Sequence, residues 1–268
     1  MAEARNPVDG VRLSYADSGG SGDPVLLLHG SALSRAIWRG LGYTAALREG
    51  FRVLALDLRG HGRSEAPHRA RSYRMELMVG DVTAVLDAAG LGAAHVVGYS
   101  LGARVGFGLA DAAPARVGSF VSLAGTPSVP RGSVDDIFFP GVDEALAAGG
   151  MDEFIERWGE RRGAPIDPQT ALALRADDPL ALRALFQALD RERGIPDSRL
   201  ALLATPTLLI AGSEDVPRAT ESARAAAVMP DARYVELAGR DHATTLRPSA
   251  PVIELILQFL RAHPLPPN

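Results

Sequence analysis

Short apolar runs alternate with helical patterns along the first half of the chain. The apolar runs cover residues 11–18, 24–30, 51–60, 94–100 and 117–125. Between the third and the fourth run, residues 73–92 space their apolar side chains for one face of a helix. This alternation predicts an α/β architecture, a mostly parallel β-sheet with helices on both faces. The residues "GGSGD" between the first two runs predict a hairpin-like turn.

The alternation is interrupted by a long segment without strand character. Residues 126–203 carry little strand pattern, but they contain amphipathic stretches such as "GMDEFIERWGERRG". Two further strand patterns and a strongly apolar helical pattern follow, at 206–215, 232–242 and 250–263. The sequence therefore predicts an α/β core made of residues 1–125 and 204–268, with a helical insertion at 126–203 between them.

Composition limits the classes of function. The 268 residues are 47% hydrophobic and 22% charged, which fits one large α/β domain with an insertion. The formal net charge of -4 argues against nucleic acid or an anionic membrane as the partner. The chain contains no cysteine and no lysine, which excludes thiol nucleophiles, disulfides, cysteine-bound metals and lysine Schiff bases. We expect a cytoplasmic protein without a metal or cofactor, because neither a membrane-spanning stretch nor a set of metal ligands is recognisable.

The stretch "GYSLG" at 98–102 follows a strand pattern and precedes a helical one. A serine between two glycines at such a junction is typical of a sharp turn that exposes one hydroxyl. Side chains at Gly98 and Gly102 would collide with the neighbouring strand and helix in that turn. A serine nucleophile also needs a base, a group that orients the base, and donors for the oxyanion. Ser100 is therefore the candidate nucleophile, and the N–H group of Leu101 at the helix start is a candidate oxyanion donor.

The candidate base is one of six histidines. His242 follows the last strand pattern, so it is expected at the same sheet edge as Ser100. His29 also ends a strand pattern and is a candidate site-lining residue. The other four have no expected catalytic role. His95 begins a strand pattern, and His263 ends the last helical pattern. His61 and His68 lie in a polar, arginine-rich loop, where a solvated position is expected.

The candidate acid follows another strand pattern at the same edge. The stretch "LLIAGSEDVP" offers Glu214 and Asp215 directly after its apolar run. We prefer Asp215, because its position three residues after Gly212 puts it in the turn beyond the strand, and Glu214 is the alternative. An aspartate that caps the next helix is a further interpretation of Asp215. The order Ser100, Asp215, His242 is the nucleophile, acid, base order of one particular fold.

The sequence resembles the α/β-hydrolase superfamily over nearly its whole length. The resemblance rests on five stretches in a fitting order, "HGSALSRAIW" (29–38), "DLRGHGRS" (57–64), "GYSLG" (98–102), "GSEDVP" (212–217) and "GRDH" (239–242). It implies the α/β-hydrolase fold with a helical cap between strands 6 and 7, where residues 126–203 lie. It also implies that Ser31, the residue after His-Gly, supplies a second oxyanion N–H group.

Differences from related subfamilies narrow the expected chemistry. Haloalkane dehalogenases and epoxide hydrolases have an aspartate where this chain has Ser100, so the resemblance disfavours both reactions. The alternative acid position of the family, after the sixth strand, is "AGTPS" here and has no carboxylate, which supports Asp215. The expected function is hydrolysis of a small carboxylic ester or lactone through an acyl-enzyme. The alternatives are carbon–carbon bond hydrolysis, thioester cleavage, cofactor-free perhydrolysis, a lyase or synthase reaction, and a weakly catalytic or non-catalytic small-molecule receptor.

Aromatic side chains are candidates for a substrate pocket. They are Tyr99 beside the nucleophile and Phe138, Phe154 and Trp158 in the insertion. Helix-spaced aromatic residues also form the hydrophobic core of a cap, which is the alternative for the last three. The expected partner is a partly apolar small molecule, and self-association into a homo-oligomer stays open.

Overall fold

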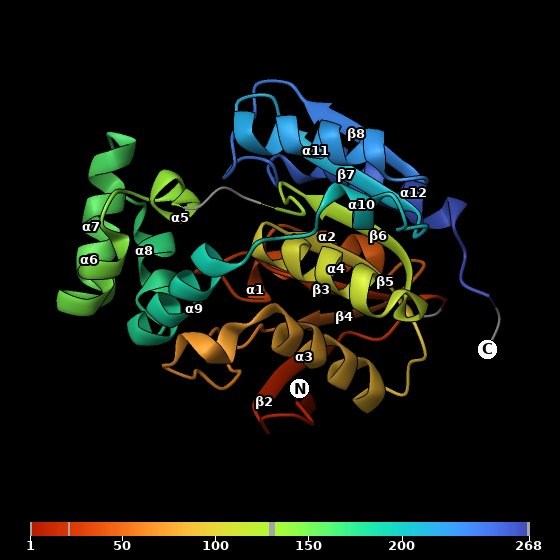
Figure 1. Ribbon diagram of the computed structural model, residues 1–268, viewed down its shortest axis with the longest axis horizontal. Helices are drawn as coiled ribbons and strands as arrows, with labels where there is room; N and C mark the ends of the chain where they lie inside the picture. The colour runs from red at the N-terminus through yellow and green to blue at the C-terminus, as the bar shows by residue number, and fades with distance from the viewer. Residues whose placement is uncertain (1, 21, 129–131, 267–268) are drawn as a thin grey trace.

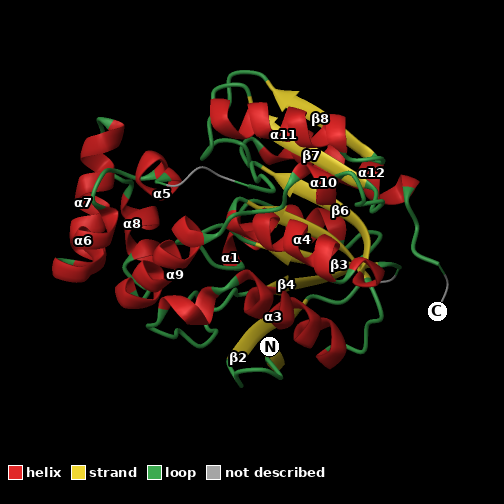
Figure 2. Ribbon diagram, in the orientation of Figure 1, coloured by secondary structure: helices red, strands yellow, loops and turns green. Residues whose placement is uncertain are grey.

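An eight-stranded sheet forms the centre of the described structure (Figure 2). The computed structural model describes residues 2–20, 22–128 and 132–266. The strand order is β1-β2-β4-β3-β5-β6-β7-β8, in which the β1–β2 and β2–β4 pairs are antiparallel and all later neighbours, from β4–β3 to β7–β8, pair parallel. The strands are β1 Ala2–Arg5, β2 Arg12–Asp17, β3 Pro24–Leu28, β4 Arg52–Leu56, β5 Ala94–Tyr99, β6 Val117–Leu123, β7 Thr207–Gly212 and β8 Ala232–Leu237. The predicted, mostly parallel sheet is confirmed.

The central strands are apolar because helices cover both faces of the sheet. Every side chain of β5 and β7 is buried, and β3, β4 and β6 are buried at nearly every position. Helices α3, α4 and α11 cover one face, while α1, α2 and α12 cover the other (Figure 1). These helices are α1 Ala36–Gly40, α2 Tyr43–Leu47, α3 Met75–Ala88, α4 Leu101–Ala112, α11 Val216–Val228 and α12 Ser249–Ala262, and two 3₁₀ turns span Ala70–Tyr73 and Pro114–Arg116.

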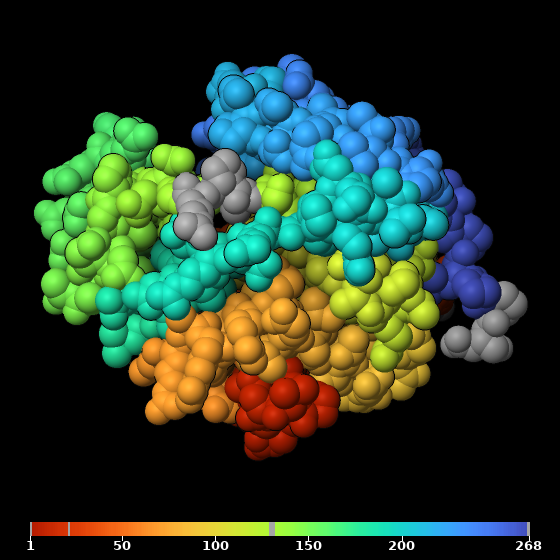
Figure 3. Space-filling model, in the orientation of Figure 1, coloured from red at the N-terminus to blue at the C-terminus, as the bar shows by residue number. Residues whose placement is uncertain are grey.

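The chain between β6 and β7 contains six helices in its described part. They are α5 Ser133–Ile137, α6 Val142–Ala148, α7 Gly150–Arg162, α8 Pro168–Leu174, α9 Pro179–Arg191 and α10 Asp197–Leu200. Helices α5 to α9 gather beyond one end of the sheet (Figure 1) and form a lobe at the side of the molecule (Figure 3). Residues 129–131 of the predicted insertion 126–203 lie outside the described residues. Across the described ranges, none of the helices has the length and apolar character needed to traverse a bilayer.

The hairpin predicted between the first two apolar runs is wrong. β2 pairs with β4, and β3 lies on the other side of β4, where it is parallel to both β4 and β5. The apolar side chains of β3 are buried on both faces of the sheet, which requires a central position. The "GGSGD" segment therefore crosses from an outer strand to a central one, and its residue 21 lies outside the described residues. The short edge strand β1, in which two alanines alternate with two charged residues, has no signal in the apolar pattern.

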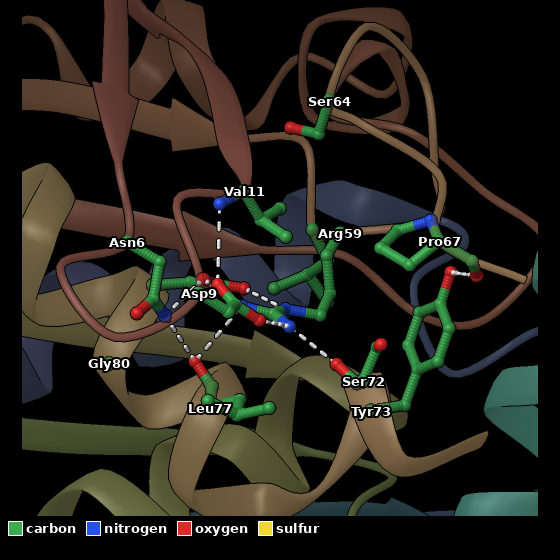
Figure 4. Close-up of polar contacts among 12 residues, drawn as sticks. Asn6, Asp9, Val11, Arg59, Ser64, Pro67, Ser72, Tyr73, Leu77 and Gly80 are labelled. Carbon is green, nitrogen blue, oxygen red and sulfur yellow. Dashed lines mark hydrogen bonds and ion pairs between the residues drawn. The ribbon is translucent and has the colours of Figure 1, made fainter. Parts of the chain in front are cut away.

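A network of ion pairs around a buried arginine joins the turn after β4 to the N-terminal segment and to α3 (Figure 4). The Arg59 side chain is fully buried and donates two hydrogen bonds to Asp81 of α3, of 2.5 and 2.6 Å. Arg59 also donates to Asp9 at 2.8 Å, and Asn6 donates to Asp81 at 2.7 Å. The network thereby fixes the β1–β2 turn, the start of the 57–64 turn and α3 relative to one another.

Replacing Asp81 with asparagine is expected to lower the free energy of unfolding by about 3 kcal/mol, because the buried Arg59 charge would keep only its partly exposed partner Asp9. Urea denaturation of the wild type and the variant measures this difference. Asp87→Asn on the same helix is the matched control. The Asp87 carboxylate pairs with Arg116 but is 68% exposed, so a change below about 1 kcal/mol is expected. Similar losses in both variants would contradict the stabilising role of the buried pair.

Candidate active site

Ser100 occupies a strained turn between β5 and α4. Its φ is 52° and its ψ is -111°, a backbone conformation that non-glycine residues rarely adopt. A Cβ atom at Gly98 would lie 2.4 Å from the Gly102 carbonyl oxygen, and one at Gly102 would lie 2.2 Å from the Leu28 carbonyl oxygen. Only glycine fits at both positions. The turn therefore has the close approach that the "GYSLG" motif predicts, with Ser100 at its apex.

Three side chains from three strand ends form a chain of hydrogen bonds. His242, in the loop after β8, has Nε2 3.0 Å from the Ser100 hydroxyl oxygen and Nδ1 2.7 Å from Asp215 Oδ2. Asp215 follows β7 directly, and its side chain is only 3% exposed. Glu214, the alternative acid, is exposed. A proton on Nδ1, donated to Asp215, leaves Nε2 free to accept the proton of the serine hydroxyl.

Further contacts hold Asp215 and His242 in place. The Arg218 guanidinium lies 3.1 Å from the other Asp215 oxygen, Oδ1. The Tyr99 hydroxyl donates to the His242 carbonyl oxygen at 2.8 Å, and the two rings stack with their centroids 5.5 Å apart. Tyr99 is buried behind His242, although the sequence made it a candidate for substrate contact. Its contacts in the structure are with His242, which it supports through the hydrogen bond and the stacked ring.

A cavity of about 40 Å³ lies beside Ser100. Its lining combines the predicted oxyanion residues with apolar and cationic side chains, among them Ser31, Leu101, Arg104, Phe138, Phe186 and Arg218. The sequence predicted Ser31, Leu101 and Phe138 for the site, but Arg104 and Arg218 were not predicted. The signal for Arg104 was present, since it follows Ser100 by four residues and shares its side of α4.

Phe154 and Trp158 lie behind the cavity wall. Their ring centroids are 5.2 and 5.3 Å from that of Phe138, and Phe154 is fully buried. Neither of the two is among the residues that line the cavity. They form the aromatic core of the inserted helices, which is the alternative that helix spacing left open.

Two buried histidines support the loop that carries Ser31. His61 Nε2 accepts a hydrogen bond of 3.2 Å from the N–H group of Ala32, whose φ is 55°. His29 Nε2 accepts one of 3.0 Å from the N–H group of Leu58. The expectation of a solvated His61 is wrong, because the 57–64 turn folds inward and leaves this ring 2% exposed. His29 is fully buried behind the site, while His68 is exposed as expected.

Both buried rings are expected to make stability depend on pH. Burial lowers the pKa of His29 to about 4 and that of His61 to about 3, against about 6.5 in the unfolded chain. Below pH 6.5 the unfolded chain therefore binds more protons than the folded protein does. The contribution of these rings to the free energy of unfolding is complete above that pH and is lost as the pH falls. Between pH 7 and pH 5 each ring is expected to remove about 1.5–2 kcal/mol from the free energy of unfolding. Urea denaturation across this range measures the slope.

His61→Gln keeps an acceptor for the Ala32 N–H group and removes one titrating ring. This variant is expected to show a shallower decline of stability between pH 7 and pH 5 than the wild type. An unchanged slope would mean that His61 does not stay neutral in the folded protein.

Among the described residues, no group of three or more His, Asp or Glu side chains is arranged to hold a metal ion.

Comparison with known proteins identifies the family. Residues 23–164 match the family model described as alpha/beta hydrolase fold. The chain belongs to the α/β-hydrolase family. This α/β hydrolase is 31% identical over 254 residues to the dihydrolipoyllysine-residue acetyltransferase component of the acetoin cleaving system of Cupriavidus necator. The match covers 88% of the α/β hydrolase but 63% of that longer relative.

Two solved structures resemble the α/β hydrolase over nearly its whole chain. A hydrolase from Pseudomonas aeruginosa PA01 is 27% identical with a TM-score of 0.81, covering 96% of this chain and 97% of its own. The esterase RhEst1 from Rhodococcus sp. ECU1013 is 27% identical with a TM-score of 0.77, covering 98% of each chain. Both structures therefore share the overall fold of this chain.

Proposed function

We propose that this α/β hydrolase cleaves a small carboxylic ester or lactone through an acyl-enzyme on Ser100. The observation that carries the proposal is the hydrogen-bonded chain from Ser100 through His242 to buried Asp215, at a turn that exposes the serine. A 27%-identical esterase that covers 98% of the chain supports ester hydrolysis over the alternatives that use the same groups. Ser100 itself argues against the aspartate-dependent epoxide and haloalkane reactions.

In the first half-reaction the Ser100 oxygen attacks the ester carbonyl carbon. Its proton passes to His242 Nε2, and Asp215 stabilises the imidazolium that forms. The carbonyl oxygen becomes an oxyanion, which the main-chain N–H groups of Ser31 and Leu101 stabilise. When the carbon–oxygen bond to the alcohol breaks, the leaving oxygen takes the proton from His242. The acyl group then remains on Ser100, and for a lactone the alcohol remains part of that acyl group.

In the second half-reaction a water molecule attacks the acyl carbon. His242 takes a proton from the water and later returns it to the Ser100 oxygen as the carbon–oxygen bond to serine breaks. The products are the carboxylic acid and the free enzyme. The same two N–H groups stabilise the second oxyanion.

The inserted residues 126–203 serve in this proposal as a cap over the site. Phe138 follows α5 and Phe186 lies on α9, and both contribute apolar walls to the cavity beside Ser100. Apolar walls exclude bulk water, which strengthens the electrostatic interactions around the oxyanion. A cavity volume of about 40 Å³ favours a short acyl group.

Mass spectrometry of the protein mixed rapidly with p-nitrophenyl butyrate tests the proposal. A mass increase of one butyryl group, located on the peptide that contains Ser100, is expected together with release of p-nitrophenol. Pretreatment with a serine-directed phosphonate is expected to abolish both. Absence of labelling and of turnover across acyl esters and lactones would favour a binding protein that retains the fold without its chemistry.

A further inference from the structure

Arg104 lines the same cavity as Ser100. Its main-chain N–H group donates to the Ser100 carbonyl oxygen at 3.1 Å, so the two residues are one helical turn apart on α4. Its side chain lines the cavity together with Ser100, Leu101 and Phe138. The Nη2 atom is buried and has no hydrogen-bond partner. Within the described part of the chain, no carboxylate lies within ion-pair distance of Arg104.

Arg104 is partly exposed, but a buried guanidinium nitrogen without a partner is costly for the folded protein. Removing a charge from water costs several kcal/mol unless a partner compensates it. Glu192 is the acidic group that acts electrostatically on Arg104, but it lies beyond ion-pair distance, and Arg218 repels the charge. Burial lowers the pKa of Arg104 to about 10, so the group is still protonated at neutral pH.

The rest of the cavity lining does not neutralise this charge. The residues that line it include two arginines, Arg104 and Arg218, and no aspartate or glutamate. Arg218 already has a partner, because it contacts Asp215 Oδ1 at 3.1 Å. Arg104 is therefore the cation that is left for a ligand, and the apolar side chains of Phe138 and Leu189 line the same space.

We propose that Arg104 binds a carboxylate group of the substrate, so that the ester or lactone cleaved at Ser100 is an anion with a short aliphatic segment between its two functional groups. This inference rests on the proposed function. A planar guanidinium matches a carboxylate through two parallel N–H···O bonds, which gives geometric specificity as well as affinity. A carboxylate there would supply the partner that Arg104 lacks and would fix the distance to the reacting carbonyl.

The carboxylate can belong to the acyl part or to the alcohol part of the ester, and two substrate pairs distinguish these. Monoethyl glutarate and ethyl valerate differ by a carboxylate on the acyl part. 4-Acetoxybutyrate and butyl acetate differ by a carboxylate on the alcohol part. In at least one pair the wild type is expected to show a higher kcat/KM for the anion.

Arg104→Gln is expected to lower the anion-to-neutral ratio of kcat/KM in that pair by about 10–100-fold, the usual effect of losing a charged hydrogen bond. Arg104→Lys keeps the positive charge but loses the planar guanidinium, so its anion-to-neutral ratio is expected to lie between those of the wild type and Arg104→Gln. Glu192→Gln removes the competing negative charge and is expected to raise the ratio. Arg175→Gln, an exposed arginine of the inserted helices that pairs with Asp152, is the control with an unchanged ratio. The inference would be overturned if the wild type had a higher kcat/KM for the neutral ester in both pairs. It would also be overturned if Arg104→Gln left the anion-to-neutral ratio of kcat/KM unchanged.

Two further readouts separate a ligand role from a structural one. Arg104→Gln is expected to raise the thermal midpoint of the free protein, because it removes an unpaired buried charge, whereas a structural Arg104 would stabilise it. Calorimetric titration with glutarate is expected to show binding to the wild type that weakens about 10–100-fold in Arg104→Gln. If the wild type hydrolyses none of the esters but binds glutarate in a way that depends on Arg104, the proposed function alone is refuted. Ester turnover with glutarate binding that ignores Arg104 would refute this inference alone.

Discussion

Ser100→Ala is expected to reduce ester turnover by at least about 10³-fold, because no other group in the cavity lining is both nucleophilic and hydrogen-bonded to a base. His242→Ala is expected to have a similar effect, since the serine hydroxyl would keep its proton. The two residues act as a unit, so the double variant is expected to be little worse than either single variant. Initial rates with p-nitrophenyl butyrate measure all three.

Ser198→Ala, at an exposed position on α10, is the matched control for these variants. It is expected to keep wild-type turnover. Circular dichroism and the thermal midpoint establish that Ser100→Ala remains folded. Wild-type turnover in a folded Ser100→Ala protein would remove Ser100 from the mechanism.

Asp215→Asn is expected to lower kcat by about 10⁴-fold while the fold remains intact. The carboxamide of asparagine favours the opposite tautomer of His242, with the proton on Nε2 where the serine proton must be accepted. Glu214→Gln is the matched control at the adjacent position. Glu214 is exposed, so this variant is expected to stay within about threefold of the wild type. A severe loss in Glu214→Gln with an active Asp215→Asn would transfer the role of acid to Glu214.

The three proposed catalytic positions were predictable because the relevant signals are local. Ser100, Asp215 and His242 each follow an apolar run, and the carboxyl ends of parallel strands meet at one edge of a sheet. Nothing in that inference required knowledge of the strand order. The measured distances of 3.0 and 2.7 Å bring together residues that are 142 and 27 positions apart in the chain.

The failed predictions concern partners that are distant in the sequence. The polar neighbours of His61 predict exposure, but Arg59 is itself paired with Asp81 and the turn is buried. The hairpin prediction for the segment after β2 depended on a short turn. In the structure β3 is buried and lies between β4 and β5, so β2 pairs with β4 instead. Arg104 was overlooked because an arginine on a helix is usually solvated. Only the packed structure shows that its Nη2 atom is buried without a partner.

The position of the inserted helices between β6 and β7 has a consequence for a chain that is still being synthesised. Ser100 and the strand β5 and helix α4 that flank its turn precede the insertion, while Asp215 and His242 follow it. A nascent chain that ends at residue 203 therefore contains the residues of the serine turn without the proposed acid or the proposed base. Domains begin to fold during translation, so this intermediate has time to form. Under the proposed mechanism, the serine hydroxyl of such a chain has no base to accept its proton, so we expect hydrolysis to begin only after the loops that follow β7 and β8 have been made.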